Sequence, residues 1–166
     1  MSRAATQNTT ASTTGGSTTG RGGKVEERLR PSWRPVASAT GDPAYSGVLL
    51  RDEQAAEDAR AMVAMVLAVW HLPQLADDAK VVATELVSNA VRHAHGTVVR
   101  ITVTRIARDR VRLAVTDKSR ELPRIQLADP LAETGRGLRL VDGLSRTWGV
   151  IPYTWGKSVW AEVATA

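Results

Sequence analysis

The 166-residue sequence has no cysteine and only three histidines. The absence of cysteine excludes a disulfide framework, a thiolate metal site and a cysteine nucleophile, and three histidines are too few to predict a histidine metal cage. No apolar run is long enough to span a membrane. The polar N-terminus lacks the apolar centre of a signal peptide, so we expect a cytoplasmic protein without a membrane segment.

The net charge of +5 does not come with a basic block. Residues 1–24 hold three basic residues and no acid, which leaves 19 basic and 17 acidic residues in the rest of the chain. No motif that reads DNA or RNA accompanies these charges. We therefore expect no direct binding to nucleic acid.

The first 45 residues lack the pattern of a folded domain. Residues 1–24 are rich in Thr, Ser and Gly, so they bury too little apolar surface to offset their ordering entropy, and we expect a disordered tail. Prolines in the next stretch argue against regular elements, which predicts an irregular lead-in over residues 25–45. A single folded domain is then expected over residues 46–166, with a short strand at Ser46–Leu50.

The spacing of apolar residues in that domain changes from the helical period to strand alternation. The expected elements are helices over residues 52–70, 75–94 and 137–146, and strands over residues 99–103, 111–115, 148–151 and 158–163. Residues 118–134 show no period and contain two prolines, which predicts a long loop. This order predicts an α+β fold, a two-layer sandwich with helices on one face of a mixed, mostly antiparallel sheet.

A carboxylate and a carboxamide lie one turn apart on the second expected helix. Glu85 and Asn89 are four residues apart, so they share one face. The Asn89 oxygen can ligate Mg²⁺, and the Glu85 carboxylate can orient or deprotonate a hydroxyl group. A solvated polar stripe is the alternative interpretation, because such pairs are common on helices.

A single acid, Asp117, ends an apolar strand. Its carboxylate can accept a hydrogen bond from an exocyclic amine such as that of adenine. It can equally close the following turn by accepting a backbone N–H, as an Asx turn does. Its position alone leaves both alternatives open.

Two glycines, Gly135 and Gly137, precede the third expected helix. They would let the backbone approach a phosphate, which the free N–H groups of the helix N-terminus can bind. Glycine turns also open many helices that bind nothing, so this motif is weak by itself.

Taken together, these segments resemble the GHKL superfamily of ATP-binding domains, which includes gyrase B and the histidine kinases. The segments that carry the resemblance are ELVSNAVRHA, LAVTDKS, ETGRGLRLVDGLSRTWGV and GKSVWAEV, in this order. Within the superfamily, the chain is most similar to the single-domain anti-sigma-factor serine/threonine kinases of bacteria. The resemblance implies the Bergerat ATP-binding fold over nearly all of the expected domain.

The resemblance also implies roles for single residues. Asn89 matches a ligand of the Mg²⁺ that bridges the ATP phosphates, Glu85 matches the catalytic general base, and Asp117 matches the acceptor for the adenine amine. Gly135, Gly137 and Leu138 match the lid over the phosphates.

One further match and two departures concern the strands. Ser158 matches a last-strand hydroxyl near the adenine and its Asp. Many members continue after that Asp with two glycines, whereas this chain has Ser119 and Glu121 there. A Cβ at those positions narrows the space and restricts φ, so ATP binding is expected more firmly than phosphoryl transfer.

The function implied by the resemblance is regulatory. The protein would bind ATP and Mg²⁺, transfer the γ-phosphoryl group to a Ser or Thr of an anti-anti-sigma antagonist protein, and sequester a sigma factor. A homodimer is compatible with this interpretation. The alternative is a module of the same fold that has lost transfer and acts only by sequestering a partner protein.

Overall fold

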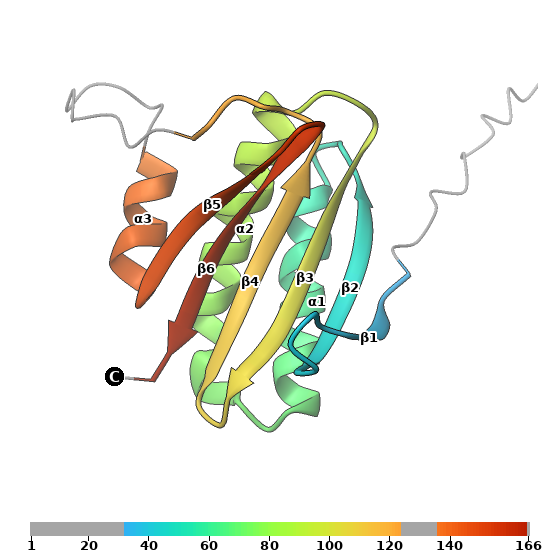
Figure 1. The fold of residues 1–166 in the computed structure, drawn as a ribbon. Helices are drawn as coiled ribbons and strands as arrows, with labels where there is room; N and C mark the ends of the chain where they lie inside the picture. The colour runs from blue at the N-terminus through green and yellow to red at the C-terminus, as the bar shows by residue number, and fades with distance from the viewer. Residues whose placement is uncertain (1–31, 124–135, 166) are drawn as a thin grey trace, which may run out of the picture.

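A computed structural model describes residues 32–123 and 136–165 and places them in two layers, with three helices on one face of a six-stranded sheet (Figure 1). The strand order is β1-β2-β3-β4-β6-β5, and every neighbouring pair is antiparallel. The strands are β1 (Arg34–Ala37), β2 (Pro43–Leu50), β3 (Val98–Ala107), β4 (Arg110–Asp117), β5 (Thr147–Tyr153) and β6 (Gly156–Ala164). The helices are α1 (Ala55–Val69), α2 (Ala76–His93) and α3 (Arg136–Leu144), with a 3-10 turn at Pro73–Leu75. The expected α+β sandwich is confirmed.

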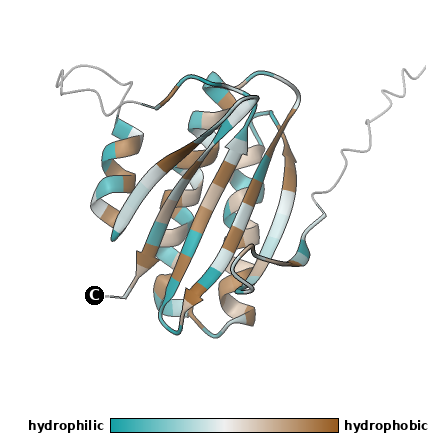
Figure 2. Cartoon of the chain, viewed as in Figure 1, coloured by the Kyte–Doolittle hydropathy of each residue, from teal (hydrophilic) through white to brown (hydrophobic). Residues whose placement is uncertain are grey.

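The alternation along β4 separates the two faces of the sheet. Val111, Leu113 and Val115 are buried in one core with α1 and α2, while the residues between them are half-buried on the opposite face. Figure 2 shows this alternation of hydrophobic and hydrophilic residues along the strands. Truncating Leu113 to alanine should cost about 2–5 kcal/mol. The core therefore fixes which side chains at the strand ends face the helices.

The two long helices follow their sequence signals closely. Asp52 does not become the cap residue of α1; instead its carboxylate accepts the Gln54 N–H at 3.0 Å just before the helix begins. After α1 the chain turns at His71, whose φ is 56°, and then enters the 3-10 turn. Across the described ranges, no helix has both the length and the apolar character needed to cross a bilayer.

The sheet begins earlier than the expected boundary at residue 46. β1 and the first residues of β2 lie in the segment that we expected to be irregular. The prolines are tolerated because Pro43 is the first residue of its strand and Pro35 lies on the edge strand β1. Trp33, just before β1, packs against the core over Gly47, where a Cβ would overlap its ring. The tail at residues 1–24 lies outside the described residues.

Candidate nucleotide-binding site

The C-terminal end of β4 carries a buried carboxylate with two hydrogen-bond donors. Asp117 is 3% exposed and continues the buried face of β4. Its Oδ1 atom accepts the Ser119 N–H at 2.7 Å and the Lys157 ammonium at 3.0 Å. The Ser119 contact is the Asx turn that one alternative predicted. The turn does not exclude a ligand contact. The Ser119 N–H and the Lys157 ammonium both bind Oδ1, which leaves Oδ2 for a ligand.

Lys157 was not identified from the sequence. It lies opposite Asp117 in the β4–β6 register, is 2% exposed, and donates a second hydrogen bond to the Ser119 carbonyl at 3.2 Å. Removing one partner of a buried ion pair costs about 3–5 kcal/mol, because the other charge stays behind without compensation. A lysine at the position that alternates with the apolar Val159, Ala161 and Val163 of the last strand is the signal that could have indicated it.

The hydroxyl that was expected beside Asp117 lies elsewhere. Ser158 pairs with Thr116, and its hydroxyl accepts the Thr116 hydroxyl at 3.0 Å. Successive residues of a strand point to opposite faces, so Ser158 lies on the face away from the helices. Lys157, one residue earlier, occupies the position beside the Asp117 carboxylate, and the role of Ser158 near the adenine stays a prediction.

On the helix layer, Glu85 and Asn89 are half-buried one turn apart on α2. α2 packs against both β4 and β6, on the face of the sheet to which the buried Asp117 belongs. Gly137, in the first turn of α3, lies against Glu85, and a Cβ at Gly137 would overlap the Glu85 carboxylate. The structure thus brings together two of the predicted residues, Glu85 and Gly137.

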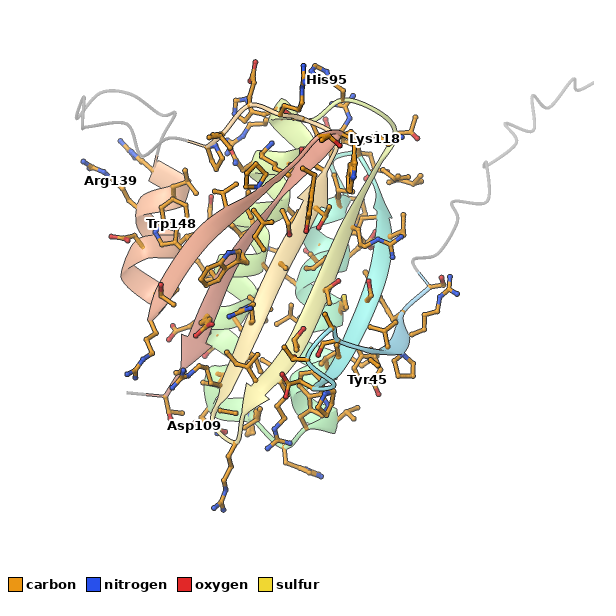
Figure 3. The ribbon with its side chains drawn as sticks, viewed as in Figure 1. Tyr45, His95, Asp109, Lys118, Arg139 and Trp148 are labelled. Carbon is orange, nitrogen blue, oxygen red and sulfur yellow. The ribbon has the colours of Figure 1, made fainter. Side chains whose placement is uncertain are left out.

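The other predicted residues of the lid divide into two groups. Leu138 is 8% exposed and anchors the first turn of α3. Nearer its C-terminal end, α3 contacts the sheet because the Trp148 indole N–H donates to the Asp142 carboxylate at 2.9 Å. Figure 3 labels Trp148. Gly135 lies outside the described residues, as does most of the loop expected over residues 118–134. The Gly135 prediction therefore stays a prediction.

The two residues that replace family glycines fit without backbone strain. Among the described non-glycine residues only His71 has a positive φ, so neither Ser119 nor Glu121 needs the conformational freedom of glycine. Ser119 is fully buried, and its hydroxyl accepts the Glu121 N–H at 3.2 Å. Both substitutions are built into a hydrogen-bonded turn that starts at Asp117.

The donor set suits a metal held jointly with a phosphate. Within residues 32–123 and 136–165, no group of three or more His, Asp or Glu side chains could hold a metal ion. Mg²⁺ commonly takes one or two protein oxygens and completes its coordination with phosphate and water. The Asn89 carboxamide, half-buried on the same face as Glu85, fits this pattern.

This α+β sandwich has a buried acid at the end of a central strand and a polar face on the adjoining helix, an arrangement compatible with a nucleotide-binding domain. The chain belongs to the histidine kinase-like ATPase domain family, whose family model matches residues 49–159. A comparison with curated proteins finds no match. The family implies ATP as the ligand of this site.

Proposed function

We propose that the protein is an ATP-dependent regulator that transfers the γ-phosphoryl group of ATP to a Ser or Thr of an antagonist protein, and that it holds a sigma factor when the antagonist is phosphorylated. The observation that carries this proposal is the buried Asp117 carboxylate at the end of β4, on the helix-facing side of the sheet. An ionised carboxylate accepts hydrogen bonds and donates none, so it suits an adenine amine and not a guanine carbonyl.

The roles proposed for the helix residues come from the family resemblance and agree with their positions on α2. Asn89 would hold Mg²⁺ through its carboxamide oxygen, and Mg²⁺ supplies charge neutralisation at the phosphates. Glu85, beside the first turn of α3, would accept the proton of the incoming hydroxyl at its carboxylate. The backbone N–H groups of that first turn are suited to phosphate oxygens.

Two variants of α2 test this proposal. Glu85→Gln keeps the size of the side chain but cannot accept the proton, so ATP affinity should stay close to wild type while transfer falls by about 10²–10⁴-fold. Asn89→Ala should weaken ATP binding in the presence of Mg²⁺ and leave the much weaker Mg²⁺-free binding unchanged. The measurements are calorimetric ATP binding with and without Mg²⁺, and incorporation of labelled phosphate into antagonist proteins whose genes neighbour the gene for this protein.

A second function is a sequestering module that binds ATP without transferring phosphate. The observation that favours it is the hydrogen-bonded turn at Ser119 and Glu121, where many kinase members have glycines. Such a protein would bind ATP and a partner protein, and would label no antagonist. Equal Mg²⁺-dependent ATP binding by Asn89→Ala and wild type would contradict the Asn89 role in both functions.

A further inference from the structure

Lys157 is the most deeply buried cation of the described chain. Lysine is almost never fully buried unless it is paired, because removing an ammonium group from water costs free energy. Here its side chain is 2% exposed, and its Nζ atom contacts two oxygens. The nucleotide contacts proposed above do not use this residue, so its burial needs a separate reason.

The Lys157 contacts fix the orientation of the Asp117 carboxylate. Oδ1 of Asp117 lies 3.0 Å from Nζ of Lys157 and 2.7 Å from the backbone nitrogen of Ser119. The same ammonium lies 3.2 Å from the Ser119 carbonyl, so one cation joins the carboxylate to the turn that follows it. With Oδ1 held by two donors, Oδ2 is the oxygen that can serve a ligand.

The backbone supports this arrangement from the β5–β6 hairpin. Gly156, the residue before Lys157, lies directly against the Asp117 carbonyl, where a Cβ would overlap the backbone. The β4–β6 register pairs Asp117 with Lys157, so the ammonium and the carboxylate share the helix-facing side of the sheet. The Asp117–Lys157 ion pair therefore lies on the side of the sheet that α2 covers, and not on the outer face.

We propose that Lys157 is a positioning residue that makes this site select adenine over guanine; this rests on the proposed ATP binding. Lys157 and the Ser119 N–H hold Oδ1, so Oδ2 is presented to the ligand as an acceptor, which matches the adenine amine and opposes the guanine carbonyl. Without the ammonium, the carboxylate loses one of the two contacts that fix this orientation, and the match to the adenine amine weakens. Lys157 thus sets base preference through Asp117 without contacting the base.

The test measures ATP and GTP affinities of the full-length chain for wild type, Lys157→Met and a control, Lys80→Met. Lys80 forms an ion pair with Asp77 at 2.9 Å on the outside of α2, where Asp77 is 97% exposed. We expect Lys157→Met to lower the ratio of ATP to GTP affinity by about tenfold or more, the scale of a mismatched buried hydrogen bond. Lys80→Met should keep the wild-type ratio.

A second pair of variants separates positioning from simple structural support. Lys157→Gln has a shorter side chain that cannot reach both Oδ1 and the Ser119 carbonyl, so it should also lower the ratio, and it replaces the Met variant if that variant does not fold. In the Asp117→Asn background, Lys157→Met should change the ratio no further, because the group through which it acts is gone.

Three outcomes would overturn the inference. A wild-type ratio in Lys157→Met or Lys157→Gln, with ATP still bound, would make Lys157 a structural residue and leave the proposed function standing. A further change of the ratio in the Asp117→Asn background would show that Lys157 acts independently of Asp117. Failure of the wild-type chain to bind ATP would remove the proposed function and the inference together.

Discussion

Asp117 has to satisfy the turn, the lysine and the ligand with two carboxylate oxygens. The Ser119 N–H and the Lys157 ammonium both use Oδ1, so in the proposed complex the remaining oxygen would serve the adenine amine. Each oxygen has a different task, and a side chain with only one acceptor oxygen cannot perform both. This makes Asp117 more sensitive to substitution than an exposed acid.

Replacing Asp117 with Asn tests this directly. The amide has one oxygen, and if that oxygen keeps the lysine and the turn, its NH₂ group faces the adenine amine. We expect ATP affinity to fall by about 1–3 kcal/mol, measured by calorimetry well below the melting temperature. The melting temperature should fall as well, because Lys157 loses its counter-charge.

The matched control is Asp109→Asn in the β3–β4 turn, where the acid is exposed (Figure 3). It removes the same charge from the chain without touching the site, so both ATP affinity and melting temperature should match wild type. An Asp117→Asn variant that binds ATP as tightly as this control would refute the acceptor role.

Contacts between residues close in sequence were predictable, whereas contacts that depend only on strand pairing were not. Glu85 and Asn89 share a helix face because of their spacing alone. The Lys157–Asp117 contact spans 40 residues and depends on the register between β4 and β6, which no local pattern specifies. The same register moves Ser158 to the outer face, since a shift of one residue reverses the face.

At the level of elements, the contact between α2 and α3 depends on a residue without a side chain. Gly137 lets the first turn of α3 approach the Glu85 carboxylate, whereas Gly143, near the other end of the same helix, faces open space. Alanine stabilises a helix interior by up to about 1 kcal/mol relative to glycine. The two glycines therefore offer a comparison within one helix.

We expect Gly143→Ala to raise the melting temperature slightly and leave phosphoryl transfer unchanged. Gly137→Ala should have a similar or smaller effect on stability, because the end of the flexible Glu85 side chain can move aside. That displacement should lower transfer by about tenfold or more, since misplacing a catalytic group by a fraction of an ångström to an ångström is costly. Equal transfer rates in the two variants would contradict a role of Glu85 in phosphoryl transfer.

The early elements show why edge strands are hard to predict. β1 is four residues long, is exposed throughout and contains Pro35, so its sequence gives neither alternation nor a β-branched run. The strand forms because β2 offers it an edge and because Trp33 finds apolar cover over Gly47. Both causes are tertiary contacts, which the local sequence does not show. The long central strands are predictable because their apolar and polar residues alternate.

For the whole molecule, the structure includes Trp33 in the folded unit, and the sequence composition predicts that the N-terminal limit of this unit lies after residue 24. Deleting residues 1–24 should leave ATP affinity and unfolding free energy within about 0.5 kcal/mol of wild type, as for neutral surface changes. Trp33→Ala in the full-length chain should cost about 1–3 kcal/mol of stability by removing packing over Gly47. Denaturant unfolding and calorimetry measure both, and a deletion as damaging as Trp33→Ala would contradict the predicted limit.

The position of the last strand has a consequence during synthesis. β6 is the final strand of the chain, yet it lies between β4 and β5 in the sheet. While the chain is still on the ribosome, β4 has an unpaired edge, and the Asp117 carboxylate has no lysine beside it. In the proposed complex, nucleotide binding requires β6, so a chain that stops before Gly156 should bind no ATP.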